Sequence, residues 1–348
     1  MISIGRTRIG RDSRPFIVAE MSGNHNRSLE TALAIVDAAA SCGAHALKLQ
    51  TYTPDTMTLD LSTADFTITD EKSLWKGETL YRLYQKAQTP WEWHQQIFDR
   101  CRERGIIGFS TPFDETAVDF LESLDVPCYK VASFELNDLR LLQRIARTRK
   151  PVILSTGMAS LSELDESVSI LRGNGCENLV LLKCTSSYPA PPDFSNLLTI
   201  PHMKELYGCE VGLSDHTKGI GTAVAAIALG ASVIEKHFTL ARADGGVDAE
   251  FSAEPGELSS LVIESNSAWQ ALGTVRYGML EEERNSIRFR RSLYVSQDMK
   301  SGDAFSEANV RCIRPGMGLA PKYIEIILGM RVNRDVARGT PVSWDLVQ

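Results

Sequence analysis

Short apolar runs alternate with longer amphipathic stretches between residues 16 and 239 of the chain. Runs of this length are typical of buried parallel strands, and stretches such as 28–42 and 90–104 are typical of the helices that connect them. Eight such cycles have the size of a closed (β/α)8 (TIM) barrel. The predicted strands are 16–22, 46–52, 105–110, 128–133, 151–157, 179–186, 210–216 and 232–239.

An open, doubly wound sheet is the alternative fold for the same alternation. That fold often carries a G-x-G-x-x-G turn after its first strand, and this chain has none there. The barrel is therefore the favoured reading.

Composition excludes several classes of partner. The net charge is -7, which disfavours nucleic acid and anionic membranes. No apolar run is long enough to span a bilayer, and the seven cysteines form no C-x-x-C pair. We expect a reduced, cytoplasmic protein with no nucleic-acid or membrane partner.

Residues 52–89 form a connection that is too long for an ordinary strand-to-helix loop. The connection leaves the carboxyl end of the second predicted strand, which is the catalytic face of a barrel. Long loops at that face usually carry function, although a plain surface excursion is the alternative.

The chain changes character after residue 280. Five residues recur 37 positions later, which predicts two copies of a small β-rich unit related by a pseudo-twofold axis. The expected domains are a catalytic barrel at 1–280, a charged linker at 281–289 and a small domain at 290–348. The repeated residues are Val295, Asp298, Gly302, Ser306 and Val310, matched by Val332, Asp335, Gly339, Ser343 and Val347.

Two histidines end neighbouring predicted strands. His216 and His237 have the strand parity of Ser214 and Glu235, so both side chains are expected in the barrel lumen. Two imidazoles suit a borderline divalent ion and leave coordination positions open for substrate. Two independently hydrogen-bonded core histidines are the alternative.

Three lysines lie within apolar strands, where an unpaired ammonium group is rare. Lys48, Lys130 and Lys183 therefore either meet carboxylates, with Glu20 and Glu235 as candidates, or face an anionic ligand. A lysine that forms a Schiff base is a third reading. The hydroxyls of Thr111, Ser133, Ser155 and Ser214 would complete a cradle for a phosphate and a carboxylate.

An acidic, glycine-rich segment follows the last predicted strand. Its glycines permit tight turns close to a ligand. Asp248 in this segment is either a sugar-binding carboxylate or part of a solvated turn.

Taken together, a series of motifs resembles the sialic acid synthase family, and within it the pseudaminic acid synthases. The series covers nearly the whole chain, in order. The motifs are AEMSGNHN (19–26), KLQTYTPDT (48–56), LWKG (74–77), TPWEWH (89–94), FSTPFD (109–114), KVASFE (130–135), STGMA (155–159), LKCTSSYPAPP (182–192), GLSDHT (212–217), EKHFT (235–239), FRRSLYV (289–295), IRPG (313–316) and GTPVSWDL (339–346).

The resemblance implies a TIM barrel followed by an antifreeze-like (SAF) domain, in a domain-swapped homodimer whose C-terminal domain caps the barrel of the other chain. It implies His216 and His237 as metal ligands, with Mn²⁺ as first choice and Mg²⁺ or Co²⁺ as alternatives. Arg314 would reach the sugar across the dimer. The implied phosphoenolpyruvate contacts are Lys48, Thr111, Lys130, Ser133, Ser155, Ser186, Tyr188 and Ser214, and the implied catalytic and sugar-binding carboxylates are Glu20, Glu135 and Asp248.

The implied reaction joins phosphoenolpyruvate to 2,4-diacetamido-2,4,6-trideoxy-L-altrose and gives pseudaminic acid and phosphate. Within the family, an N-acetylneuraminate or legionaminate synthase is the alternative. The N-acetylneuraminate members carry an asparagine where this chain has Ser186. Outside the family, the alternatives are a metal-free Schiff-base aldolase, a metal-dependent sugar isomerase and a non-catalytic carbohydrate-binding protein.

Overall fold

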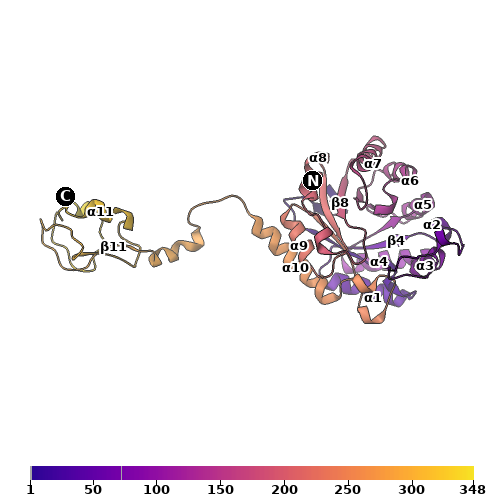
Figure 1. The fold of residues 1–348 in the computed structure, drawn as a ribbon, viewed down its shortest axis with the longest axis horizontal. Coiled ribbons are helices and arrows are strands. Elements are labelled where there is room, and N and C mark those ends of the chain that lie inside the picture. Colours follow the sequence, from indigo (N-terminus) through magenta and orange to yellow (C-terminus); the bar gives the residue numbers. More distant parts are fainter. Residues whose placement is uncertain (1, 72) are drawn as a thin grey trace. The chain divides into compact units, whose positions relative to one another are not determined.

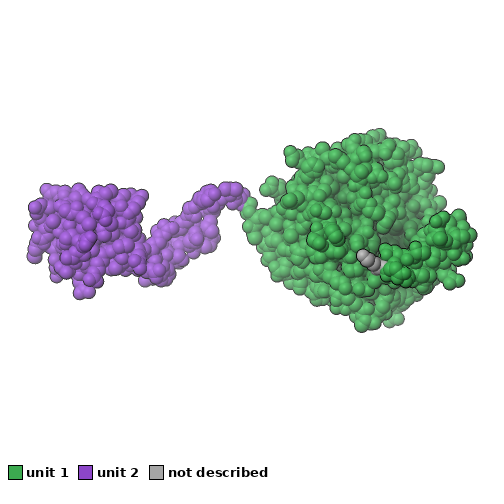
Figure 2. Space-filling model, viewed as in Figure 1, with its two compact units in different colours: residues 1–273 green, residues 274–348 purple. Residues whose placement is uncertain are grey.

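The computed structural model describes residues 2–71 and 73–348, which divide into two compact units at Gly273 (Figures 1 and 2). The division falls earlier than the boundary expected at residue 280, because the last helix of the first unit ends at Leu272. The segment expected as a linker, residues 281–289, is a 3-10 helix. Its first turn is held by the carboxylate of Glu283, which accepts a hydrogen bond from the Leu280 N–H at 2.7 Å.

The first unit is a closed barrel of eight parallel strands, as predicted. Each strand pairs with the next along the chain, and β10 closes the barrel against β3. The strands are β3 (Phe16–Glu20), β4 (Ala46–Thr51), β5 (Ile107–Pro112), β6 (Tyr129–Val131), β7 (Val152–Ser155), β8 (Leu179–Cys184), β9 (Glu210–Asp215) and β10 (Val233–His237).

Each barrel strand is followed by a helix of the outer ring. Side-chain caps start several of these helices. Ser28 accepts from the Thr31 N–H at the start of α1, and Asp114 accepts from the Ala117 N–H at the start of α5. The ring helices are α1 (Leu29–Ser41), α4 (His94–Arg104), α5 (Glu115–Ser123), α6 (Leu139–Ala146), α7 (Leu161–Gly173), α8 (Thr199–Tyr207), α9 (Gly221–Ala228) and α10 (Pro255–Leu272).

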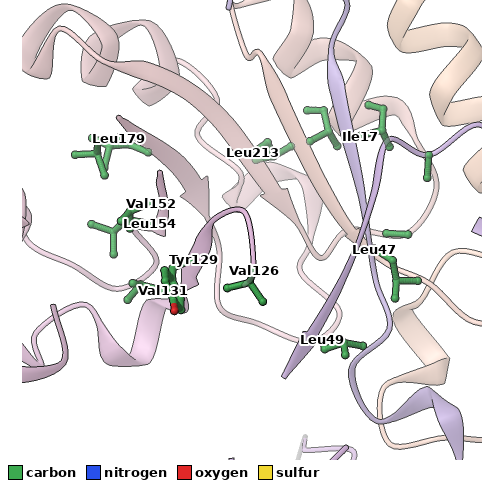
Figure 3. Packing of buried hydrophobic residues seen from close by; sticks show 14 of the residues in the cluster. Ile17, Leu47, Leu49, Val126, Tyr129, Val131, Val152, Leu154, Leu179 and Leu213 are labelled. Atoms are coloured by element: carbon green, nitrogen blue, oxygen red, sulfur yellow. The ribbon is translucent and has the colours of Figure 1, made fainter. Parts of the chain in front are cut away.

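Strand alternation builds two separate cores. Residues such as Ile17, Leu47 and Val131 point outward and pack under the helices (Figure 3). Phe16 and Val180 point inward and fill the lower lumen, where the hairpin of β1 (Ile2–Ile4) and β2 (Thr7–Ile9) adds three buried isoleucines. The same inward parity places polar side chains at the carboxyl ends of the strands.

The connection between β4 and α4 is folded. It contains α2 (Pro54–Met57), a 3-10 turn at Ala64–Phe66, and α3 (Leu80–Ala87). An antiparallel bridge joins Thr67 to Thr79 within it.

The second unit confirms the internal repeat. Val295 pairs with Val310 in the sheet of β11 (Ser292–Val295) and β12 (Val310–Ile313), and Val332 pairs with Val347 in an equivalent bridge. A reciprocal pair of backbone hydrogen bonds also joins the two copies. The N–H groups of Met299 and Val336 each donate to the other residue's carbonyl at 2.9 Å. A short helix, α11 (Ile324–Ile327), completes this unit.

Candidate active site

A cavity of about 290 Å³ lies at the carboxyl ends of the barrel strands. Most of the predicted site residues line it, namely Lys48, Lys130, Ser133, Glu135, Ser155, Tyr188, Ser214, His216, His237 and Asp248. Glu20 and Thr111 are buried directly behind Lys48 and contact its ammonium group. Ser186 lies beside Cys184, with its Oγ 3.8 Å from the cysteine sulfur.

The barrel register explains how these residues meet. Glu20 pairs with Lys48 across β3 and β4, and with His237 across β3 and β10. Ser214 pairs with Glu235 across β9 and β10, and its hydroxyl donates to the Glu235 carboxylate at 3.0 Å. Neighbouring strands therefore bring cations, carboxylates and imidazoles into one layer of the lumen.

Lys48 and Lys130 have carboxylate partners and also line the cavity. The Lys48 Nζ lies 3.1 Å from Glu20 Oε2 and 3.5 Å from Glu235 Oε1, and the Lys130 Nζ lies 3.8 Å from the same Glu235 oxygen. Lys130 also donates to the Ser155 hydroxyl at 2.6 Å. Lys183, by contrast, lies on the outer face of β8, where its Nζ donates to the Cys184 carbonyl at 2.8 Å.

Glu20 and Glu235 both contact Lys48, but the pKa values of the two carboxyl groups shift in opposite directions. Glu235 faces both lysines, which outweigh the cost of burial and hold its pKa below the usual value. Burial raises the pKa of Glu20 to about 7, because Lys48 and Gln50 offset only part of the loss of water and the nearby Glu235 carboxylate adds to the rise. The two lysines are thus only partly neutralised, which leaves an electrostatic preference for an anionic ligand.

Glu135 is the other carboxylate with a shifted pKa. It follows β6 in the 3-10 turn Ser133–Glu135, and burial raises its pKa to about 7 although Lys130 opposes the shift. Among the residues that the structure describes, one oxygen each of Glu135 and Glu235 is buried with no hydrogen-bond partner. Such atoms are costly in a folded protein unless a ligand or water satisfies them.

His216 and His237 lie side by side, with ring centroids 5.3 Å apart and ring planes inclined by 57°. The His216 Nδ1 is 3.0 Å from the Thr185 carbonyl oxygen, which can only accept, so Nδ1 donates and the neutral form of the ring has its lone pair on Nε2. Burial and the neighbouring His216 lower the pKa of His237 well below its usual value, so its ring is neutral at ordinary pH. Its Nδ1 has no hydrogen bond within residues 2–71 and 73–348.

For His216, burial is outweighed by the Cys184 sulfur and the Thr185 carbonyl, which raise the pKa of this ring. Two neighbouring imidazoles, one of them with a nitrogen that lacks a hydrogen bond, fit a divalent cation that takes its other ligands from water and substrate. No group of three or more histidine, cysteine, aspartate or glutamate side chains among the described residues is placed to hold a metal. Any ion here would therefore rest on these two protein ligands.

Asp248 lies beside the imidazole pair. Its Oδ2 accepts a hydrogen bond from the Ser22 hydroxyl and is 3.7 Å from the His237 Nδ1. Burial raises the pKa of this carboxyl. Asp248 is buried, not part of a solvated turn, so the ligand-facing alternative of the sequence analysis fits the geometry better.

The serine side of the cavity depends on a glycine. The backbone N–H of Gly157 donates to the Ser133 hydroxyl at 3.0 Å. A Cβ at position 157 would lie 2.3 Å from the Ser186 Oγ and 2.8 Å from the Ser133 Oγ. Glycine is needed here so that the two hydroxyls can approach the chain.

Glu235 lies between the two lysines, so one of the carboxylate partners expected for them from the sequence is confirmed. Gln50, which was not among the predicted site residues, donates to Glu20 at 3.0 Å, and its lumen parity was the available signal. The apolar lining from the β4–α4 connection had no comparable signal.

Arg314, the remaining predicted site residue, lies on the exposed surface of the second unit, directly after β12.

The described residues contain no helix with the length and apolar character needed to cross a membrane. All seven cysteines are free thiols.

Comparison with known proteins identifies the family. The chain is 44% identical to the pseudaminic acid synthase of Campylobacter jejuni, over 94% of this chain and 95% of that protein. It is 35% identical to the N,N'-diacetyllegionaminic acid synthase of the same species, over 91% of this chain and 95% of that protein. A crystal structure of N-acetylneuraminic acid synthetase from Leptospira borgpetersenii, in complex with citrate, superposes with a TM-score of 0.73 at 33% identity, covering 83% of this chain and 95% of that one.

Family models agree with these relatives. The SAF domain model matches residues 290–348. The NeuB family model matches residues 35–277, most of the barrel. The chain therefore belongs to the NeuB family, the sialic acid synthases.

Proposed function

We propose that this chain is a pseudaminic acid synthase, which condenses phosphoenolpyruvate with 2,4-diacetamido-2,4,6-trideoxy-L-altrose and releases phosphate. One observation carries the chemistry: two buried lysines and two neighbouring imidazoles share one cavity. The choice of sugar is supported by the higher identity to a pseudaminic acid synthase, 44%, than to a legionaminic acid synthase, 35%.

The lysines would bind phosphoenolpyruvate. Lys48 and Lys130 are at most 4% exposed, so a phosphate or carboxylate beside them is attracted in a medium with little screening by water. The hydroxyls of Ser155 and Ser214 lie among these charges and can turn toward the anion. Held in this way, the substrate presents its third carbon to the sugar at a fixed distance.

His216 and His237 would hold a divalent cation, with Mn²⁺ as the first choice and Mg²⁺ or Co²⁺ as alternatives. When bound, such an ion supplies Lewis-acid polarisation of an aldehyde oxygen. The hydrogen bond from His216 to the Thr185 carbonyl fixes the tautomer that this role requires.

Glu135 is our choice for the proton transfer that accompanies addition of water to the second carbon of phosphoenolpyruvate. It lines the cavity, has an unpartnered buried oxygen, and has a pKa of about 7, where a group accepts and returns a proton with little penalty. Glu20 is the weaker candidate, because Lys48 and Gln50 already occupy its carboxylate. We propose that Asp248, which lies next to His237, binds sugar hydroxyls.

The proposal includes a domain-swapped homodimer, in which Arg314 of one chain contacts the sugar bound to the other barrel. Arg314 is exposed and followed by Pro315 and Gly316, so its forked guanidinium can meet hydroxyl and acetamido oxygens. The cytoplasmic location stays a prediction, which cell fractionation tests.

A direct assay tests the function. The purified protein is incubated with phosphoenolpyruvate and a panel of amino sugars, and both phosphate release and product mass are measured. We expect phosphate and a nine-carbon acid with the trideoxy altrose sugar. Product only with an N-acetylmannosamine or legionaminic precursor would move the chain to that branch.

The Schiff-base alternative needs its own control. Burial lowers the pKa of Lys130 to about 8, which is the property that an imine-forming lysine would need. Borohydride is therefore added during turnover. Loss of activity with a substrate adduct on the protein would favour the aldolase over the synthase.

A further inference from the structure

One side of the candidate active site is apolar. The connection between β4 and α4 contributes only apolar and aromatic side chains to the cavity lining, within the described part of the chain. We call five of these residues the apolar wall: Met57, Ile68, Trp75, Leu80 and Leu83. The strand ends contribute the lysines, histidines and carboxylates.

Backbone hydrogen bonds and a helix cap hold the apolar wall in place. The backbone N–H of Ile68 donates to the Glu78 carbonyl at 2.9 Å, and the Gly77 N–H returns a bond to the Ile68 carbonyl at 2.8 Å. Leu80 begins α3, whose N-terminus is capped by the Thr79 hydroxyl. These bonds fix the direction in which Ile68 and Leu80 face.

Trp75 connects the apolar wall to residues beside Asp248 and the imidazole pair. Its indole N–H donates to the Val247 carbonyl at 2.9 Å, next to Asp248. Its ring centroid lies 6.0 Å from that of Tyr188, which in turn lies 4.5 Å from the ring of His216. The apolar wall is therefore within reach of a ligand bound at the imidazole pair.

The two sides of the cavity select a ligand with two kinds of surface. A hydroxyl placed against the apolar wall loses its hydrogen bonds to water and gains none in return. A methyl group in the same place gains from leaving water. The matching ligand thus has polar groups at the reacting end and methyl groups on its flank.

We infer that the apolar wall binds the methyl groups of the sugar substrate and makes the enzyme selective for a 6-deoxy, acetamido sugar over its hydroxylated counterparts. This inference rests on the proposed function. It assigns the discrimination between sugars to the β4–α4 connection, while the strand ends serve the phosphoenolpyruvate and the aldehyde.

Leu80→Asn and Met57→Gln test this assignment, because each change keeps the approximate side-chain size and adds an amide. The sugars are the trideoxy diacetamido substrate, its 6-hydroxy analogue and its diformamido analogue, used as substrates or competitive inhibitors. We expect the wild type to prefer the parent sugar over at least one analogue by about tenfold or more. Each variant should reduce that preference by about threefold or more, with the KM for phosphoenolpyruvate unchanged.

Leu61→Asn is the matched control, since Leu61 belongs to the same connection but is 43% exposed and outside the cavity lining. It should keep the wild-type preference. Equal losses for all sugars in both wall variants, or an unchanged preference in both, would overturn the inference. A wild type that makes no product from the parent sugar would instead overturn the proposed function. The thermal midpoint and the KM for phosphoenolpyruvate show whether each variant is folded.

Discussion

A buried ion pair behind the imidazoles offers a quantitative test of the structure. Lys236 and Asp215 precede the two histidines in sequence and lie on the opposite face of their strands from the lumen. The Lys236 Nζ is 2.8 Å from Asp215 Oδ2 and donates to the Thr217 carbonyl at 2.5 Å. The other Asp215 oxygen accepts from the Thr217 N–H and hydroxyl.

The expected cost of breaking this pair follows from its burial. Both side chains are at most 2% exposed. At 2.8 Å the attraction is about 6 kcal/mol for an effective dielectric constant of about 20, and desolvation cancels much of it. Lys236→Met leaves a buried carboxylate without a counterion, so we expect a loss of about 3–5 kcal/mol in the free energy of unfolding.

The double variant separates charge from packing. Asp215→Asn keeps an acceptor for Thr217 but leaves Lys236 unpaired, and should cost a similar amount. Combining it with Lys236→Met removes both charges, so the double variant should be more stable than either single variant and within about 2 kcal/mol of wild type.

Urea unfolding followed by circular dichroism measures all three differences. A loss below about 1 kcal/mol for Lys236→Met, or a double variant as unstable as the sum of the single ones, would refute the reasoning. Mn²⁺ binding, measured by electron paramagnetic resonance, should weaken in the folded single variants. That result would show that the pair also positions the histidines.

Four further outcomes are expected. Chelation should abolish turnover and Mn²⁺ should restore it, whereas His216→Ala and His237→Ala should remain folded, bind no Mn²⁺ and stay inactive; full activity after exhaustive chelation would contradict the metal. With ¹⁸O in the bridging position of phosphoenolpyruvate, mass spectrometry should find the label in phosphate; label in the sugar acid would mean phosphorus–oxygen cleavage. Because burial raises the pKa of Glu135 to about 7, a base there loses activity as the pH falls through that value, and Glu135→Gln should remove this limb and lower kcat about 100-fold or more. Mixed Arg314→Ala and His237→Ala proteins should recover about a quarter of wild-type activity after subunit exchange, since half of the dimers carry one intact site; no recovery after verified exchange would place Arg314 in its own chain's site or in none.

Much of the barrel and of its polar layer could be predicted from the local pattern of apolar and polar residues. Strand runs and parity correctly predicted eight parallel strands and placed Lys48, Lys130, His216 and His237 in one cavity. A period of two decides which face a side chain occupies, and parallel strands must end at the same rim. The 37-residue repeat likewise predicted two copies of a small β-rich unit, and reciprocal backbone hydrogen bonds join these copies in the structure.

Pairing between distant residues was decided only by the tertiary structure. Lys183 and Lys130 look alike in sequence, yet Lys183 faces outward and Lys130 shares Glu235 with Lys48. The apolar wall was equally hidden, because apolar residues in a long connection have no period that tells a cavity lining from a packed surface. The sequence determines each strand and its faces through local sterics and hydrophobicity. The distances that set charge, pKa and selectivity arise when the barrel closes and brings separate segments together.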